Sequence, residues 1–568
     1  MSVKQFNSVK KSKVPMNKFN LSHSRLFTAD PFYLYPVMVE DCIPGDRWTI
    51  SNEMLVRNNP MASPIMHEQD VYVHYFFVPY RLLWKDWEAF FEGGKDGRFV
   101  GSIPSVSDII TNASNSFFQA GGLFEYLYNQ SVQSFSSELY QMPNFFPLKA
   151  YIMIWNEYYR DRNVMPHVNL NINLNETDEG RSGYDNLLIT QGEWQNIGYC
   201  NDRMFFKRCW RKDYFTSSLP WQQRGTVPSF DLFGTAALTL GQTTVTSGGS
   251  GSDPGAIGYA YINRITPLPG LTLGIHDHGG SPAVAASNAL ANASSLRELL
   301  AGATIDLSGG QLNADVHDMR TAFQITRLLE LSARGGGRYN ELLKSIYPAH
   351  PRDDRLQRPE YIGGNKVPVV VNEVLQTAES ATSGESGVGS MYGHGVTANR
   401  EYIAKYRVQE HGVILGLFSV IPKAVYSQGI DRQWMKTSRW DYYYPQFMNL
   451  SEQAIYTHEL FATGSKPVDN VFGYQSRYDE YRFRRNTVHG LFKTDFYYWH
   501  MARRFSTPPT LNTSFLIPSE GEINDPVNGL KRVLQVPSEP MYLVHFGCNN
   551  TAVRPLPFMA IPGYVDHH

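Results

Sequence analysis

Runs of apolar residues bounded by Pro, Gly or Asn mark the extended segments of this chain. The clearest run is DVYVHYFFVPYRLLW, which starts at Asp70. In an extended strand, side chains 71, 73, 75 and 77 point one way and side chains 72, 74, 76 and 78 the other. Both sets are apolar enough to be covered. We therefore predict a strand in a sandwich whose outer face is covered by insertions.

Three further segments rich in β-branched or aromatic residues are predicted strands. They are Val367 to Leu375, His411 to Ile421 and Met541 to Phe546. The predicted strands are spread from one end of the chain to the other. A sheet system built from such distant segments requires non-local pairing, as in jelly rolls and other Greek-key sandwiches.

A helical period appears in residues 316–346. An apolar stripe follows the candidate N-cap Asp315, three glycines at 335–337 stop it, and a second short stripe runs to Pro348. The stripe residues are Val316, Met319, Phe323, Ile325, Leu328 and Leu329, then Tyr339, Leu342, Leu343 and Ile346. We predict two short packed helices here.

Glycine, serine and asparagine dominate three other stretches. Residues 226–315, with TVTSGGSGSDPGAIG and PAVAASNALANASS, are poor in charge and form a predicted large insertion. Such a segment buries little apolar surface alone, so it is either disordered or ordered by neighbouring copies. Residues 380–395 and the segment around Gly93 to Gln130 are predicted surface loops.

The formal charge of the 568 residues is −2, so contact with nucleic acid must be local. Residues 1–29 form a basic arm with no acidic residue before Asp30. Its cations are Lys4, Lys10, Lys11, Lys13, Lys18 and Arg25. The arm either neutralises phosphates or is a solvated terminus.

A second basic segment, RYDEYRFRRNTVHGLF, covers residues 477–492 and mixes aromatic rings with Arg482, Arg484 and Arg485. Guanidinium groups can hold phosphates while rings stack on unpaired bases, which suits single-stranded DNA. The alternative is an interface or core segment in which arginines pair with Asp479 and Glu480, and we favour this alternative.

Motifs of enzymes and metal sites are missing from the sequence. There is no GxxxxGK[ST] loop, GxSxG elbow or HExxH, and the four cysteines form no CxxC pair. His276, Asp277 and His278 are a weak metal candidate without a second ligand cluster nearby in the sequence. We expect no enzyme, cofactor or metal, and a protein made in a reducing cytoplasm without membrane insertion.

Several segments, in order along the chain, resemble the major capsid proteins of the Microviridae, of the gokushovirus type. They are FTADPFYLYPVMVEDCIPGDRW, CWRKDYFTSSLPWQQRG, ARGGGRY with RLQRPEYIGG, FGYQSRYDEYRFRRNTVHGLF and NNTAVRPLPFMAIPGY. The resemblance implies a mainly β protein, an eight-stranded antiparallel jelly roll with long insertions containing short helices. It also implies self-assembly into a T=1 icosahedral capsid around a circular single-stranded DNA phage genome.

The resemblance implies three parts: the arm 1–29, a jelly-roll core of 30–225 and 316–568, and a surface insertion 226–315 that protrudes at the threefold axes and contributes to host attachment. Implied partners are other copies of the chain, the DNA genome, a small basic DNA-binding phage protein and a host cell-surface receptor. The alternatives are a phage receptor-binding protein, which usually has repeats or a stalk, and a carbohydrate-active β-sandwich enzyme.

Overall fold

The computed structural model describes only part of the chain. The described residues are 15–92, 101–106, 110–111, 115–132, 142–168, 189–190, 198–225, 322–323, 325–326, 357–375, 391–450, 452–462 and 470–559. The chain divides into two units, one of residues 1–224 and 329–568 and one of residues 225–328. Every strand of the described residues belongs to the first unit.

The strands of the described residues are β1 (Asn17–Asn20), β2 (His23–Ala29), β3 (Tyr35–Cys42), β4 (Arg47–Asn58), β5 (Gln69–Pro79), β6 (Ile110–Thr111), β7 (Ile189–Thr190), β8 (Glu360–Pro368), β9 (Val371–Leu375), β10 (Met391–Arg407), β11 (Gly412–Pro422), β12 (Gln453–Tyr456), β13 (Val471–Gln475), β14 (Tyr542–Cys548) and β15 (Thr551–Arg554). The α-helices are α1 (Tyr80–Leu83), α2 (Trp87–Glu92), α4 (Asn115–Phe118), α5 (Leu123–Tyr128), α6 (Phe146–Ile154), α12 (Thr513–Leu516) and α13 (Glu520–Asn524). Shorter turns are the π-helix η1 (Trp155–Tyr159) and the 3₁₀ helices η3 (Arg432–Trp434), η4 (Arg439–Asp441), η5 (Pro445–Phe447), η6 (Thr457–Glu459), η7 (Asp479–Tyr481), η8 (Gly490–Lys493), η9 (Tyr497–Trp499) and η10 (Leu530–Val533).

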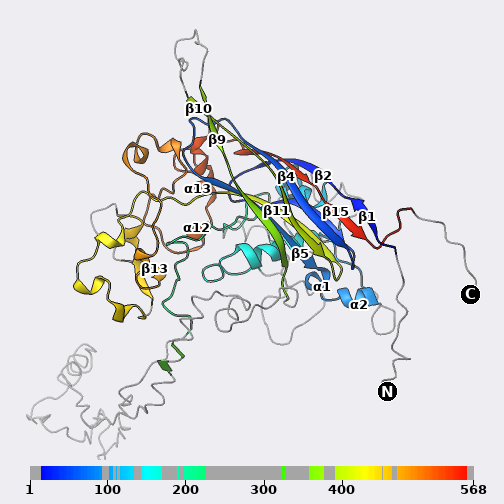
Figure 1. Cartoon of the computed structure of the whole chain (residues 1–568), viewed down its shortest axis with the longest axis horizontal. Coiled ribbons are helices and arrows are strands. Elements are labelled where there is room, and N and C mark those ends of the chain that lie inside the picture. Colours follow the sequence, from blue (N-terminus) through cyan, green and yellow to red (C-terminus); the bar gives the residue numbers. More distant parts are fainter. Residues whose placement is uncertain are drawn as a thin grey trace, which may run out of the picture. The chain divides into compact units, whose positions relative to one another are not determined.

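Two antiparallel sheets form the centre of the first unit (Figure 1). The first sheet has the order β2, β14, β4, β10, β9. At one end of β4, β15 continues β14 as its neighbour, and β1, which continues β2, pairs with β15. The second sheet has the order β3, β11, β5, β8. Strands that follow one another in sequence, such as β2, β3, β4 and β5, alternate between the two sheets. The chain is therefore mainly β, with long-range pairing as predicted.

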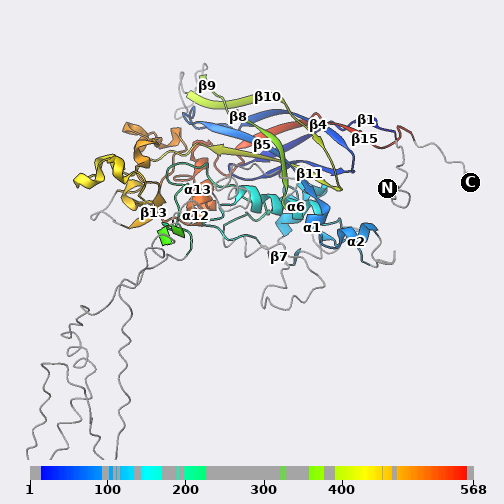
Figure 2. The same cartoon turned by 60° about the horizontal axis from the view of Figure 1, so that its bottom comes forward.

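Strand β5 is covered on both faces, as the sequence predicted. Tyr75 is fully buried and its hydroxyl accepts a hydrogen bond from Asn52 of β4, so this face points to the other sheet. On the opposite face, His74 bonds the Tyr159 hydroxyl at 2.8 Å, and the Phe76 ring lies 4.7 Å from that of Tyr158. The second cover comes from the insertion between β5 and β8, whose helices α1 and α6 lie beneath the second sheet (Figure 2).

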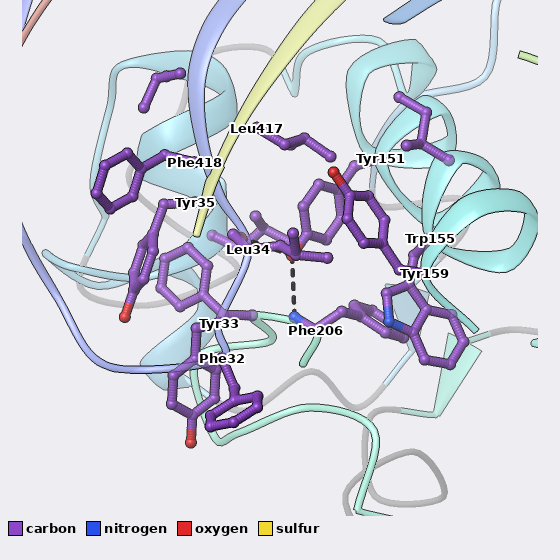
Figure 3. Packing of buried hydrophobic residues seen from close by; sticks show 14 of the residues in the cluster. Phe32, Tyr33, Leu34, Tyr35, Tyr151, Trp155, Tyr159, Phe206, Leu417 and Phe418 are labelled. Atoms are coloured by element: carbon purple, nitrogen blue, oxygen red, sulfur yellow. Dashed lines mark hydrogen bonds between the residues drawn. The ribbon is translucent and has the colours of Figure 1, made fainter. Parts of the chain in front are cut away.

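Tyr151 of α6 ties this insertion to the strands (Figure 3). Its hydroxyl donates to the Leu34 carbonyl at 2.9 Å and accepts from the Phe206 N–H at 3.0 Å. The indole of Trp155 donates to the Lys207 carbonyl at 2.7 Å. Because these polar groups are buried and paired, the aromatic core between sheet and insertion loses little to desolvation.

Predicted strands at His411 to Ile421 and Met541 to Phe546 are confirmed as β11 and β14. The prediction of one strand from Val367 to Leu375 is wrong. Here the chain leaves the second sheet at the end of β8 and enters the first as β9. The residues Val369 and Val370 make that crossing, and an apolar run alone does not reveal such a change of sheet.

The segment around Gly93 to Gln130, predicted as a surface loop, is partly core. Phe117, Phe118 and Phe124 of α4 and α5 are almost fully buried. These helices are too short to show a clear helical period, so composition suggested a loop. Nothing is described for residues 93–100, 107–109 and 112–114.

Residues 17–29, which we assigned to the basic arm, form β1 and β2. Alternation of polar residues with Phe19 and Phe27 suits an edge strand, and the Phe27 ring packs on Phe418 with centroids 5.4 Å apart. The first 14 residues, the insertion 226–315 and nearly all of the helix pair 316–346 lie outside the described residues. Within the described residues, no helix is both long and apolar enough to cross a membrane.

Candidate subunit and nucleic-acid surface

Exposed apolar side chains gather in the insertion between β11 and β14. Of the thirty-three large apolar side chains exposed among the described residues, fourteen fall between residues 430 and 496. Six exposed aromatic residues form what we call the aromatic surface: Trp434, Trp440, Tyr442, Tyr443, Tyr481 and Phe483. An exposed group of this size is typical of an interaction site.

Short 3₁₀ helices hold the first part of the aromatic surface, the yellow segment of Figure 1. Ser438 caps η4: its hydroxyl accepts from the Trp440 N–H, and Asp441 accepts from the Ser438 N–H at 2.8 Å. This reciprocal capping fixes the backbone that carries Trp440 and Tyr442. The ring positions therefore depend on local hydrogen bonds more than on a core beneath them.

Tyr478 joins the two segments of the aromatic surface. Its backbone is in the left-handed region with φ 68°, and its ring is buried. The Tyr478 hydroxyl donates to the Tyr442 carbonyl and accepts from the Tyr444 N–H, both at 3.2 Å. Its ring lies edge-on to Tyr443 at 5.1 Å. One buried tyrosine thus sets the spacing between the run at 440–444 and the run at 478–483.

Lys436 and Glu480 form a nearly buried ion pair under this surface, with Nζ and Oε1 3.3 Å apart. The Lys436 ammonium also donates to the Tyr481 hydroxyl at 2.6 Å and lies 4.0 Å from the centre of that ring. Gln453 of β12 donates to the other Glu480 oxygen at 2.8 Å. The charge of Lys436 is therefore compensated within the chain.

Arg485 is a structural residue in this geometry. It forms an ion pair with Asp431 at 2.5 Å and donates to the carbonyls of Gly429 and Glu459. Glu459 is buried and also pairs with Arg432 at 3.3 Å. Burial raises the pKa of the Glu459 carboxyl above its usual value, although Arg432 opposes that effect. Together these contacts hold the loop before η3 against η6.

The other two candidate arginines of this segment are more exposed. Arg482 pairs with Asp479, as the intramolecular alternative proposed, whereas Glu480 pairs with Lys436 instead of an arginine. Arg484 donates to the Gln433 side-chain oxygen at 2.6 Å. Each of the three arginines thus has a partner within the chain.

The arm candidates divide between described and undescribed residues. Lys4, Lys10, Lys11 and Lys13 lie outside the described residues. Lys18 is exposed on β1. The guanidinium of Arg25 on β2 donates to the Tyr126 carbonyl at 2.8 Å, and burial lowers its pKa. Lys18 is thus the exposed cation of the two.

Sequence reasoning did not single out Trp434, Trp440, Tyr442 and Tyr443. The signal was present, because residues 434–447 read WMKTSRWDYYYPQF, with six aromatic residues in fourteen. Aromatic density does not separate a core segment from a surface one, since exposure depends on the rest of the fold. The exposure of these residues could therefore be found only from the tertiary structure.

His67 and His74 do not converge on a metal. His67 bonds the Lys423 carbonyl at 2.8 Å, while His74 bonds the Tyr159 hydroxyl, also at 2.8 Å. Within the part of the chain that the structure describes, no group of three or more His, Cys, Asp or Glu side chains is arranged to bind a metal. His276, Asp277 and His278 lie outside that part.

Comparisons with known proteins cover nearly the whole chain. The family model described as "Capsid protein (F protein)" matches residues 7–564. The chain is 30% identical over 610 aligned positions to "Capsid protein VP1" of Chlamydia phage 1, covering 98% of this chain and 97% of that protein. It is 30% identical to the protein of the same description from Bdellovibrio phage phiMH2K, over 96% of this chain and 95% of the relative. For "Capsid protein VP1" of Spiroplasma virus 4 the identity is 26%, over 99% and 97%.

Proposed function

The chain belongs to the capsid protein (F protein) family of the Microviridae, and from this premise we propose that copies of it assemble into a T=1 icosahedral shell around a circular single-stranded DNA genome. It is a major capsid protein of the virion and a structural protein, not an enzyme. Self-assembly follows from that family membership, while the shell geometry and the form of the genome are our proposal.

The strand order supports an eight-stranded jelly roll, and it is the observation that carries this part of the proposal. With β1 and β15 counted as continuations of β2 and β14, the two sheets pair as β2, β14, β4, β10 and β3, β11, β5, β8. Two four-stranded antiparallel sheets, between which consecutive strands alternate except at the β5–β8 pair, are the arrangement of the viral jelly roll. Strand β9 extends the first sheet, and the long connections after β5 and β11 are insertions.

Negative-stain electron microscopy of the protein, purified alone and from infected cells, tests the shell. We expect small icosahedral particles in at least one preparation, because identical subunits with several contact surfaces close into a point group. Monomers or trimers alone in both preparations would contradict the proposal. They would favour a receptor-binding protein or a carbohydrate-active enzyme instead.

We propose that the basic arm, more than the arginines at 482–485, contacts the genome. Five lysines lie within the first 18 residues without an acidic neighbour, whereas the three arginines have partners in the chain. Replacing Lys4, Lys10, Lys11, Lys13 and Lys18 with Gln should lower the DNA content of particles, measured by the ratio of absorbance at 260 and 280 nm. The pair Arg482→Gln and Arg484→Gln is the control. DNA loss in the control but not in the arm variant would overturn this assignment.

We also propose that residues 226–315 form a protrusion at the threefold axes that contributes to attachment to a host receptor. The support is compositional, because a segment poor in charge and large apolar residues needs neighbouring copies to become ordered. A variant lacking residues 240–300 should form particles that adsorb poorly to host cells. Normal adsorption by intact variant particles would exclude the attachment role.

A small basic phage protein is a further proposed partner. The formal charge of −2 leaves most phosphate neutralisation to another chain, even with the arm engaged. Mass spectrometry of purified virions should therefore detect a short chain rich in Lys and Arg beside this protein.

A further inference from the structure

We propose that the aromatic surface is covered by a second copy of this chain in the assembled particle. The inference rests on the proposed shell function and goes beyond it, because it names the surface that forms one of the contacts. The side chains concerned come from the two segments 432–450 and 477–485 of the insertion between β11 and β14.

The first argument is exposure. Trp434 is 76% exposed, Phe483 58% and Tyr442 55% in the single chain. The aliphatic neighbours Met448 and Leu450 are also about half exposed, at 47% and 49%. Aromatic residues and Met are enriched where protein interfaces are buried, whereas the bases of single strands stack chiefly on aromatic rings. The mixture therefore fits a protein partner.

The second argument is that the surface is already ordered in the single chain. The capping of η4 by Ser438, the two hydrogen bonds of the Tyr478 hydroxyl and the pair of Lys436 with Glu480 hold its backbone and its base. Ordering of side chains and loops opposes association, so a surface ordered in advance loses less on binding. Trp434 and Phe483 can then act as anchors in the partner's surface.

The third argument is charge, which distinguishes a protein partner from DNA. Residues 430–496 contain nine Lys and Arg and eight Asp and Glu, a net charge of +1. The cations Arg432, Lys436, Arg482, Arg484 and Arg485 contact partners within the chain. Arg439 and Arg477 lie over the rings of Trp440 and Tyr478. A net charge of +1 is a small excess, whereas phosphate binding needs a large one. In a shell, the neighbours of each subunit are copies of the same chain.

Oxidative footprinting of particles tests the proposal directly. Hydroxyl-radical labelling of Trp434, Tyr442 and Phe483 would be measured by mass spectrometry in dissociated subunits, in DNA-free shells and in filled virions. We expect labelling to fall on assembly, in both kinds of particle, to the level of the buried Trp155. Protection only in filled virions would identify DNA as the cover and overturn the proposal. Full labelling in both particles would also overturn it.

A matched pair of variants provides the second test. Trp434→Glu puts a charge on the surface and should abolish particles while the subunit keeps its melting temperature, because the indole is mostly exposed. Trp434→Phe keeps an apolar ring and should restore assembly. Particles from Trp434→Glu in normal yield would overturn the inference but leave the shell function intact. Absence of particles from the unsubstituted protein would overturn the shell function itself.

Discussion

Arg503 is a charged residue buried in the core of the first unit. Its Nε donates to Glu522 at 3.0 Å, its Nη2 donates to the Phe515 carbonyl at 2.9 Å, and Trp210 lies against the guanidinium at 4.8 Å. Burial lowers the pKa of Arg503, but Glu522, Tyr426 and Asp213 together more than offset this, so the net shift is upward. The arginine is thus charged and paired with Glu522, while its Nη1 is buried without a hydrogen-bond partner among the described residues.

Arg503→Met should destabilise the subunit by about 3 kcal/mol, at the lower end for breaking a buried pair because Glu522 keeps some contact with solvent. Chemical unfolding of the unassembled subunit would measure the loss. Arg81→Met, which removes a partly exposed pair with Glu410, is the control and should lose about 1 kcal/mol or less. Equal losses in both variants would contradict the assignment of Arg503 to the core.

His74 makes the fold sensitive to acid. Burial, with a smaller contribution from Arg208, lowers its pKa to about 3, whereas an unfolded histidine titrates near 6.5. Between these values only the unfolded chain binds the proton, so the stability contributed by neutral His74 is complete above about pH 6.5 and is lost as the pH falls toward 3.

His74→Phe should therefore gain stability relative to the unsubstituted protein as the pH is lowered from 7 to 4, measured as the difference in melting temperature. Tyr159→Phe removes the hydroxyl that His74 contacts but keeps the imidazole, so it should retain the acid sensitivity. If the difference in melting temperature between His74→Phe and the unsubstituted protein does not change with pH, His74 is not the cause of the acid sensitivity.

At the scale of elements, the contact between the loop at Gly429 and helix η6 depends on the absence of a side chain. A Cβ atom at Gly429 would lie 1.8 Å from the Glu459 carbonyl oxygen, so the backbone would have to move. The displaced loop carries the Arg485 contacts and leads into η3 and Trp434. This junction positions one end of the aromatic surface.

Gly429→Ala should destabilise the subunit by about 1–3 kcal/mol, the usual range for overpacking, and should lower particle yield. Gly547→Ala in β14 is the control, since its Cβ would meet its nearest neighbours at 3.6 Å, an ordinary contact. Unfolding midpoints of both variants would be compared at one pH. A stable Gly429→Ala subunit would contradict the tight junction.

The elements that sequence could predict are those with local signals. β5, β11 and β14 follow from runs of β-branched and aromatic residues ended by Pro, Gly or Asn. The break between β8 and β9 did not follow, because the valine-rich run 367–371 continues from the end of β8 into β9 and only the pairing partners differ. The aromatic surface was missed for a similar reason: whether Trp434 is buried depends on which distant segments cover it.

At the scale of the whole molecule, the fold limits the reactivity of its four cysteine side chains. Cys42, Cys200, Cys209 and Cys548 are free, and burial raises the pKa of each, to about 12 for the last three. Thiolate is the reactive form, so all four thiols are protonated at neutral pH; Cys42, Cys200 and Cys548 are also buried, and Cys209 is half-buried.

Ellman's reagent should therefore label the native subunit very slowly and react with all four thiols after denaturation. The absorbance of the released thionitrobenzoate gives the count per chain. Reducing agent should leave the melting temperature unchanged, because these four cysteines form no disulfide. Rapid labelling of the native subunit would mean that the core around at least one cysteine opens readily.

The pairing of the two ends of the chain has a consequence for synthesis. β14 lies between β2 and β4, and β15 lies between β1 and β4, so the last strands translated fill the gap between the first ones. During translation, the edges of β2 and β4 that pair with β14 and β15 stay unpaired until residues 542–554 have been synthesised. A truncated chain keeps those edges exposed and prone to aggregation. We therefore expect that only chains containing residues 542–554 enter a shell and that a product truncated before them is excluded.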